Sequence, residues 1–381
     1  MSNYEKPTGS YISFMSNLVK TNGGINLAQG IPGFMPPKEL LHILSDIANE
    51  PVHQYAPGTG NNTLKEGLVK HYSKFKEFST NDFLITNGGT EAITILFTYL
   101  MKILPEDFTS LAFDPVYEVY NNLPTIYNKK FTRFSFENDG SIDFEKFITV
   151  IREKNVKLVF VNTPGNPYGR FWTKEEFDRI IQLAKEENFY IILDAVYNEL
   201  YFDEKPYVPI ENINEHIFYT NSFSKLFSVT GWRIGYLVAH ESHMKQIQQI
   251  HDYIGLCSPS VLQEALARYI NSSDFGKEYV SDLRNKLKDS FNLLKPELEK
   301  LGFIIPPTKG GYFIWAKLPT GYSDSFDFSM SLYKETGVAV IPGIHFSENC
   351  NNYIRINIAR ETTEIKEAII GITKYISKTR N

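Results

Sequence analysis

Short runs of apolar residues alternate with longer amphipathic stretches through the middle of the sequence. Runs of this length, bounded by turn residues, predict buried strands, and the stretches between them predict helices. Strands separated by helices favour an α/β fold with a mostly parallel sheet that is covered on both faces. The predicted strands are SLAFDP (110–115), KLVFVNTP (157–164), FYIILDAVY (189–197) and the start of HIFYTNSFS (216–224).

Helix signals follow the same alternation. The segment GGTEAITILFTYLMKIL (88–104) predicts a turn followed by an apolar helix. Thr173 and Glu176 have the spacing of a capping box, which predicts the start of a helix. A long helix is predicted over 283–302, before a smaller α+β segment. We therefore divide the chain into an N-terminal arm with part of a small domain (1–45), a large domain (46–280) and a small C-terminal domain (281–381).

Composition narrows the possible partners. The 381 residues include 39 basic and 44 acidic side chains, a formal net charge of -5, without a basic block, so neither nucleic acid nor a membrane surface is an expected partner. Cys257 and Cys350 are far apart and in no metal-ligand spacing, which argues against a disulfide framework or a metal site. The first residues lack a secretory pattern, and no apolar run could span a bilayer. A cytoplasmic location is expected.

Polar side chains follow the predicted strands at the sheet edge where open α/β folds bind ligands. Asp194 comes directly after the apolar run YIIL, where a carboxylate is costly unless it is paired. Tyr197 lies three residues further on, and Asn166 follows the preceding strand. A helix cap or a surface ion pair would be the ordinary explanation of Asp194 alone. A carboxylate, a phenol and an amide at one edge would instead suit a polar heteroaromatic ring.

A lysine with apolar neighbours lies in NSFSKLFSVTGWRIGY (221–236). Lys225 has Phe and Leu residues beside it, unlike a solvated surface lysine. Burial lowers the pKa of an amine and makes it a usable nucleophile toward a carbonyl group. Groups near it in the sequence suit a phosphate dianion: the hydroxyls of Ser222 and Ser224 and the guanidinium of Arg233. A second, distant element that suits an anion is the helix start at Gly88, Gly89 and Thr90.

These motifs resemble those of one family, the fold type I, class I/II aminotransferases of the aspartate aminotransferase superfamily. The similarity runs almost from end to end, and it is most specific where a lysine and an arginine stand eight residues apart. The resemblance implies pyridoxal 5'-phosphate (PLP) as cofactor, and a seven-stranded, mostly parallel sheet between helices beside a smaller α+β domain. The motifs are INLAQG (25–30), NTPGNPYG (162–169), DAVY (194–197), SFSK (222–225), GWRIGY (231–236) and YIRINIA (353–359). INLAQGIPGF and HQYAPGTG are most similar to the kynurenine/glutamine/methionine aminotransferase branch.

The resemblance also implies roles for individual residues. Lys225 would form the Schiff base with PLP and move the proton at the substrate α-carbon. Asp194 would keep the pyridine nitrogen protonated, and Asn166 and Tyr197 would hydrogen-bond the ring 3-oxygen. Tyr117 would stack on the ring. The phosphate would be held by Gly89, Thr90, Ser222, Ser224 and Arg233, together with Tyr55 of a second subunit, so a homodimer with shared active sites is expected.

Arg355 would bind the substrate α-carboxylate, helped by Gly30 and Asn166. Aspartate-specific relatives carry a second arginine for the distal carboxylate, in the stretch that corresponds to 251–270. The only arginine there is Arg268, on a predicted helix. We therefore expect ping-pong transfer of an amino group from a neutral amino acid, such as methionine, glutamine, an aromatic one or kynurenine, to a 2-oxo acid. Selection of the side chain would fall to Ile31, Tyr117 and Tyr312.

Two other functions stay open from the sequence. A PLP-dependent β-lyase or synthase would use the same cofactor site, because PLP chemistry depends on which bond of the α-carbon is aligned with the ring. A PLP-binding transcription regulator would need a winged-helix segment before the domain, and we expect none, since the similarity begins by about residue 25 and no basic recognition helix is visible. The tyrosine of NPYG and the loop IPGIHF (341–346) depart from commoner family sequences, and these departures bear on substrate contacts.

Overall fold

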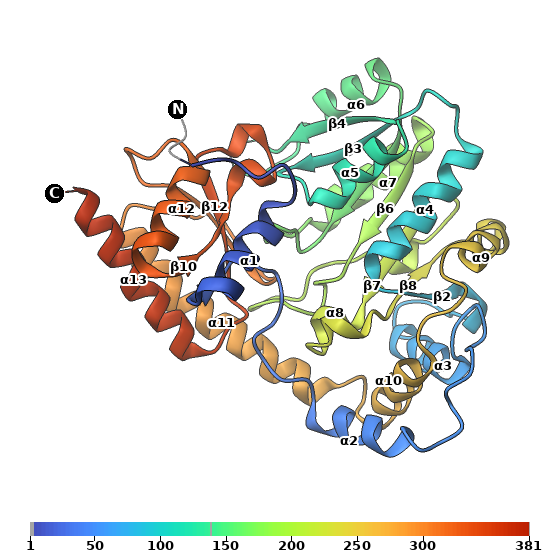
Figure 1. Cartoon of the computed structure of the whole chain (residues 1–381). Coiled ribbons are helices and arrows are strands. Elements are labelled where there is room, and N and C mark those ends of the chain that lie inside the picture. Colours follow the sequence, from blue (N-terminus) through green and yellow to red (C-terminus); the bar gives the residue numbers. More distant parts are fainter. Residues whose placement is uncertain (1–3, 138, 381) are drawn as a thin grey trace.

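The computed structural model describes residues 4–137 and 139–380, and its largest element is a seven-stranded sheet (Figure 1). The strand order is β2-β8-β7-β6-β5-β3-β4. β8 is antiparallel to β2 and β7, and the other neighbours are parallel, which confirms the predicted mostly parallel sheet. The strands are β2 (Phe83–Thr86), β3 (Thr109–Asp114), β4 (Lys130–Ser135), β5 (Val156–Asn162), β6 (Tyr190–Asp194), β7 (Ile217–Ser222) and β8 (Gly235–Val238).

The central strands are mostly apolar and almost entirely buried because helices cover both faces of the sheet. Side chains of successive residues point to opposite faces. Ile191 and Leu193 therefore join one core cluster, with residues of α6, α7 and α10, while Ile192 joins another, with residues of α4 and α9. The helices around this sheet are α2 (Lys38–Ile47), α3 (Asn62–Tyr72), α4 (Gly89–Ile103), α5 (Glu118–Ile126), α6 (Phe144–Glu153), α7 (Lys174–Glu186), α8 (Phe223–Leu226), α9 (Glu241–Ile254) and α10 (Ser260–Ser272).

Both strong helix-start signals of the sequence are confirmed. Gly88, with a φ of 82°, precedes the first turn of α4. Thr173 caps α7 by accepting a hydrogen bond from the backbone N–H of Glu176, whose side chain accepts one from the backbone of Thr173. The Thr173 cap satisfies an N–H group that the first turn of a helix leaves without a partner.

A second, antiparallel sheet has the order β11-β12-β9 and lies beside the first (Figure 1). The N-terminal segment packs here, because β1 pairs with β10 and Met15 joins a core cluster with Trp315 and Phe326. The division into domains at residues 45 and 280 stays a prediction. The elements are α1 (Tyr11–Asn22), β1 (Ile25–Asn26), α11 (Lys277–Lys300), β9 (Phe313–Lys317), α12 (Ser325–Thr336), β10 (Val338–Ala339), β11 (Ile341–Pro342), β12 (Tyr353–Asn357) and α13 (Thr362–Arg380). Short 3-10 turns span Thr80–Asp82, Ile210–Asn212, Thr230–Trp232, Gly343–His345 and Glu348–Cys350.

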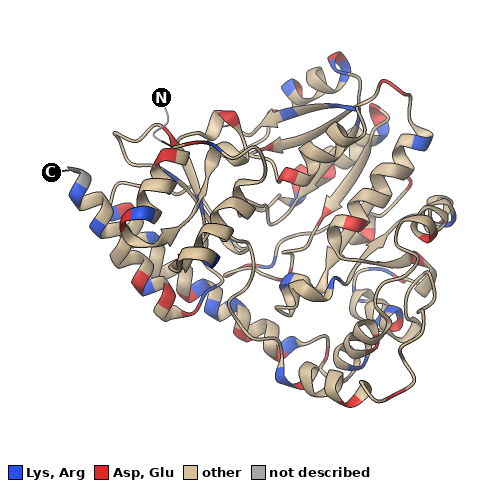
Figure 2. Ribbon diagram, in the orientation of Figure 1, with Lys and Arg blue, Asp and Glu red and all other residues tan. Residues whose placement is uncertain are grey.

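The outer surface carries charges of both signs. Figure 2 shows lysine and arginine interspersed with aspartate and glutamate over the helices, without a face of one sign. In the part of the chain that the structure describes, no helix combines the length and apolar character needed to cross a membrane.

Candidate active site

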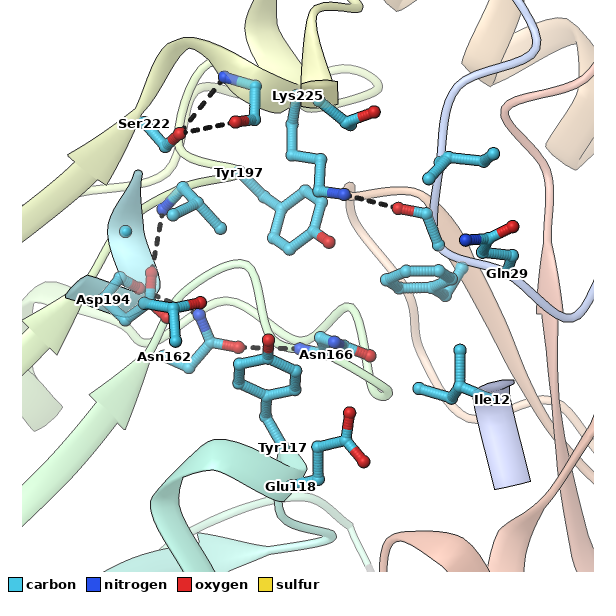
Figure 3. A pocket seen from close by; sticks show the side chains of 18 of the residues that line it. Ile12, Gln29, Tyr117, Glu118, Asn162, Asn166, Asp194, Tyr197, Ser222 and Lys225 are labelled. Carbon is cyan, nitrogen blue, oxygen red and sulfur yellow. Dashed lines mark hydrogen bonds between the residues drawn. The ribbon is translucent and has the colours of Figure 1, made fainter. Parts of the chain in front are cut away.

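A cavity of about 250 Å³ lies at the carboxyl edge of β5, β6 and β7, between the large sheet and β9 and β12. Thirteen of the residues proposed from the sequence line it, although they come from segments as distant as 30 and 355. Figure 3 shows Lys225 and Asp194 on different elements around this cavity, α8 and β6, with Tyr197 between them in the view and Tyr117 below. The thirteen are Gly30, Ile31, Gly89, Thr90, Tyr117, Asn166, Asp194, Tyr197, Ser222, Ser224, Lys225, Arg233 and Arg355.

Lys225 lies on α8, the short helix that follows β7. Its ammonium group donates a hydrogen bond to the carbonyl oxygen of Gly30. Burial lowers the pKa of Lys225 to about 8, and the positive charges of Arg355 and Arg233 act in the same direction. A sizeable fraction of the amine is therefore neutral near physiological pH, which is the form that attacks a carbonyl.

Asp194 ends β6 and is buried at the floor of the cavity. Burial raises the pKa of its carboxyl to about 6, against the lowering effect of the hydrogen bond from Tyr120. The Tyr120 hydroxyl donates to Oδ2 at 2.6 Å, and the backbone N–H of Val196 donates to Oδ1 at 3.2 Å. A cationic ring nitrogen would stabilise this buried carboxylate.

Sequence reasoning missed Tyr120, although its spacing gave a signal. Tyr120 lies three residues after Tyr117 in the first turn of α5, and residues three apart share one face of a helix. Its ring stacks on Phe160 with centroids 4.9 Å apart, which fixes the hydroxyl toward Asp194. Tyr120 is therefore a positioning residue for Asp194.

Asn162 was also missed, because its relation to Asp194 depends on the register between two strands. It is the last residue of β5 and is in register with Asp194 on β6, so both side chains reach the same edge. Its amide donates to the carbonyl of Asp194 at 2.9 Å, and its oxygen accepts from the N–H of Asn166 at 2.7 Å. Asn162 thus holds the loop that carries Asn166, which the sequence analysis had proposed.

One end of the cavity is suited to an anion. Gly89 and Thr90, in the first turn of α4, line this end of the cavity, and the free backbone N–H groups of a helix start favour an anion. Ser222, Ser224 and Arg233 complete the cradle, and the Ser222 hydroxyl donates to Ser224 at 2.9 Å. A Cβ on Gly88 would lie 2.5 Å from Nη2 of Arg233, so this approach requires glycine. Backbone donors, hydroxyls and a guanidinium are the groups that bind a phosphate dianion.

The opposite end is suited to a carboxylate. Arg355 on β12 is only 1% exposed, and its guanidinium lies 4.2 Å over the ring of Phe313. Nη1 donates to Asn166 at 2.9 Å and Nη2 to the carbonyl of Ala28 at 2.6 Å. Among the described residues Nε of Arg355 has no hydrogen-bond partner. Burial lowers its pKa to about 10, so the group remains a cation that a bound carboxylate would stabilise.

Two residues that were proposed for the site from the sequence, Tyr55 and Tyr312, do not line the cavity. Tyr55 is 84% exposed and outside the cavity of its own chain. Tyr312 is fully buried, and its hydroxyl donates to the backbone carbonyl of Lys225 instead of lining the cavity. The next residue, Phe313, lines the cavity in its place. Adjacent residues of an extended segment point to opposite sides, so choosing between the two required the register of β9.

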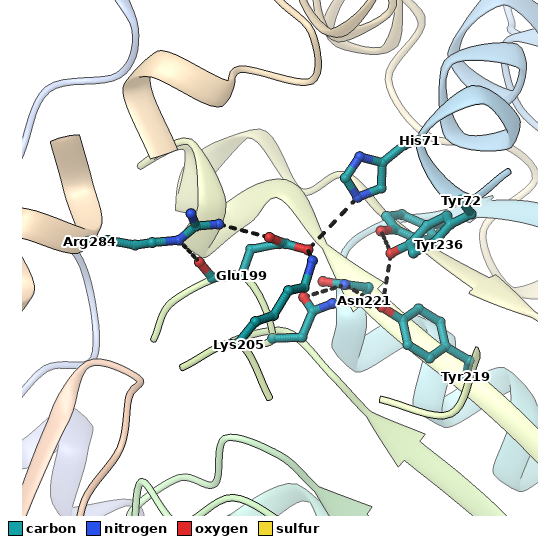
Figure 4. A network of polar contacts seen from close by, with 9 residues as sticks. His71, Tyr72, Glu199, Lys205, Tyr219, Asn221, Tyr236 and Arg284 are labelled. Atoms are coloured by element: carbon teal, nitrogen blue, oxygen red, sulfur yellow. Dashed lines mark hydrogen bonds and ion pairs between the residues drawn. The ribbon is translucent and has the colours of Figure 1, made fainter. Parts of the chain in front are cut away.

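Beneath the cavity, buried phenols and amides form a polar network (Figure 4). The Tyr72 hydroxyl lies 2.9 Å from that of Tyr219 and 2.7 Å from that of Tyr236. Asn221 donates to the Tyr219 hydroxyl at 2.8 Å, and its oxygen accepts from the N–H of Ser222 at 2.7 Å. The network therefore supports the end of β7, from which Ser222 enters the anion cradle.

A buried amine, a buried carboxylate and an anion cradle around one cavity define an enzyme of the PLP-dependent kind. The donor set fits that cofactor: Arg233 with the serines and α4 would hold its phosphate, Asp194 its ring nitrogen and Lys225 its aldehyde carbon. The chain belongs to the aminotransferase class I and II family, whose model matches residues 22–372. Enzymes of this family use PLP, so this protein is a PLP-dependent aminotransferase.

Individual relatives cover nearly the whole chain at modest identity. An aspartate aminotransferase of Pyrococcus horikoshii is 28% identical over 358 residues, which cover 92% of this chain and 90% of that protein. An LL-diaminopimelate aminotransferase of Natranaerobius thermophilus is 27% identical over 363 residues, with coverage of 93% and 92%. The solved structure of a methionine aminotransferase from Escherichia coli superposes with a TM-score of 0.87 at 25% identity, covering 98% of this chain and 99% of that one.

Proposed function

We propose that the protein transfers the amino group of a neutral, fairly large amino acid to a 2-oxo acid by a ping-pong mechanism, as a homodimer. The observation that carries the proposal is the set of cations in the cavity. Among the described lining residues these are Lys225, Arg233 and Arg355. Arg233 would bind the cofactor phosphate, and Arg355 would bind the substrate α-carboxylate. A distal carboxylate would then lack a partner, and an unpaired buried charge costs several kcal/mol.

Arg268 does not supply the missing cation. It lies on α10, where its guanidinium binds both oxygens of Glu50 at 2.7 and 2.5 Å. Its Nε donates to Glu264 at 2.8 Å. Two carboxylates thus already engage this arginine, and it does not line the cavity. The similar proteins carry names with different substrates, aspartate, LL-diaminopimelate and methionine, and the charge of this cavity favours a neutral one.

The chain's own residues have separate tasks in this reaction. Bound PLP supplies an electron sink for the bonds of the substrate α-carbon. Lys225 is placed to remove and return the proton at that carbon, because its amine is partly neutral near pH 8. Asp194 would keep the ring nitrogen of the bound cofactor protonated, and Tyr197 and Asn166 would hydrogen-bond its 3-oxygen. Arg355 orients the substrate by its α-carboxylate, while Ile31 and Phe313 give the side-chain region its apolar wall.

The test compares specificity constants (kcat/KM) for aspartate, methionine, phenylalanine, glutamine and kynurenine with one 2-oxo acid acceptor. Each of the four neutral amino acids should exceed aspartate by about tenfold or more, because aspartate brings a second, unpaired carboxylate into the cavity. If aspartate exceeded all four, the proposal would be wrong, and a basic residue from a second subunit would have to be sought.

A further inference from the structure

One carboxylate that lines the cavity would pair neither with the cofactor nor with the amino and carboxyl groups that all amino acid substrates share. The lining residues of the described chain include two acids, Asp194 and Glu118. Asp194 pairs with the ring nitrogen in the proposed reaction. Glu118 faces the remaining space, which is the volume that a substrate side chain would occupy.

Glu118 is held in place at the first position of α5. The Ser10 hydroxyl donates to its Oε2 at 3.0 Å, and Nε2 of His345 lies 3.2 Å from the same oxygen. Among the described residues no hydrogen bond engages Oε1, and Figure 3 shows the carboxylate directed toward the cavity beside Ile12. One oxygen is therefore fixed by the protein, and the other is available to a ligand.

The negative charge at this position is stable. The close contact with His345 is the largest influence that lowers the pKa of Glu118, and Arg355 lowers it further. The start of α5 also favours an anion through the helix dipole. Glu118 is therefore ionised at neutral pH. Because Ser10 precedes α1 and Ile12 lies on it, the same contact fixes an apolar wall next to the carboxylate.

We propose that Glu118 determines specificity for the substrate side chain, disfavouring a second carboxylate and favouring a side chain that ends in a hydrogen-bond donor such as the amide of glutamine. This inference rests on the proposed function and narrows its substrate class. Two carboxylates in a cavity with little water repel each other strongly. An amide N–H donating to Oε1 would form a charge-assisted hydrogen bond, which is stronger than a neutral one.

Glutamine and glutamate provide the sharpest comparison, because they have the same shape and differ only in the terminal group. We would measure kcat/KM of the holoenzyme for both amino acids, with methionine as an uncharged reference. The wild type should prefer glutamine to glutamate by about tenfold or more, and Glu118→Gln should lower that ratio by about tenfold. Glu118→Ala should lower the ratio similarly, because it also removes the charge.

Glu241→Gln is the matched control. Glu241 is likewise the first residue of a helix, α9, but it is exposed and lies outside the cavity, so the ratio should not change. If methionine is turned over well and the ratio is the same in the wild type and both Glu118 variants, the inference is overturned while the proposed function stands. If aspartate exceeded methionine, phenylalanine, glutamine and kynurenine in the wild type, the proposed function itself would fail.

Discussion

Burial of a single amine sets the pH at which this protein can take up its cofactor. An exposed lysine is almost wholly protonated below about pH 9, whereas burial brings the pKa of Lys225 to about 8. Protein prepared without cofactor should therefore bind PLP covalently at a rate that rises with pH, reaching half its maximum near pH 8, because the lowered pKa leaves the amine neutral above that point. Stopped-flow absorbance of the bound cofactor measures this rate.

The control is 4'-deoxypyridoxine phosphate, which lacks the aldehyde and should bind without the same pH dependence. A midpoint near pH 10 would show that Lys225 behaves as an exposed lysine. Lys225→Ala should bind PLP without becoming covalently labelled after borohydride reduction.

Single residues also show where sequence reasoning reached its limit. Lys225, Asp194 and Arg355 could be proposed because their motifs are specific and each lies in a strand or shortly after one. Tyr312 and Phe313 could not be separated, since one step of strand register exchanges the two faces. Glu118 was recognised only once α5 was seen to place it against the cavity, and the spacing of Tyr120 from Tyr117 was a signal whose meaning became clear only from its hydrogen bond to Asp194.

At the scale of elements, long apolar strands were predictable and short ones were not. β3, β5, β6 and β7 coincide closely with apolar runs, because burial on both faces leaves a continuous hydrophobic signal. β1, β10 and β11 have two residues each, and Ile25 pairs with Val338 far along the chain. Such pairings depend on tertiary packing and leave no local pattern in the sequence.

Arg284 joins two elements that the sequence does not connect. It lies on α11, and its guanidinium donates to the backbone carbonyl of Glu199 at 2.6 Å and to the side chain of Glu199 at 2.8 Å (Figure 4). Lys205 binds the same carboxylate at 2.7 Å, and His71 lies 3.9 Å away. Glu199 follows β6 closely, so this arginine ties α11 to the loop that carries Tyr197.

Arg284→Met should lower the free energy of unfolding by about 1–3 kcal/mol, because it leaves a mostly buried carbonyl and carboxylate oxygen without donors. Methionine retains most of the apolar part of the arginine side chain, so the loss of stability measures mainly the contacts that the guanidinium makes. Urea denaturation measures the change. Lys295→Met is the control on the same helix, since Lys295 forms a half-exposed pair with Glu299 and should cost no more than about 0.5 kcal/mol. Equal losses in both variants would contradict the assigned role of Arg284.

For the whole molecule, the exposed aromatic residues are the clearest indication of a partner. Tyr55 is 84% exposed and Tyr253 is 94% exposed. The segment after Tyr55 lies against the end of α9, since a Cβ on Gly58 would be 3.4 Å from the carbonyl oxygen of Leu256. Leu256 and Ile254 are also exposed. Apolar groups gathered in this way are typical of a protein–protein interface. In the proposed homodimer, Tyr55 of one subunit would reach the cofactor phosphate of the other.

Shared sites can be tested by mixing inactive variants. Lys225→Ala and Tyr55→Ala should each be nearly inactive alone, but a mixed dimer contains one site with both residues intact. Random mixing should therefore restore about a quarter of the wild-type activity, because half of the dimers are mixed and half of their sites are complete. The control mixes Lys225→Ala with Asp194→Ala. These residues line the same cavity of one chain, so every site in the mixed dimer lacks one of them and no activity should return. Recovery in both mixtures, or a fully active monomer in sedimentation, would exclude an active site completed by Tyr55 of a second subunit.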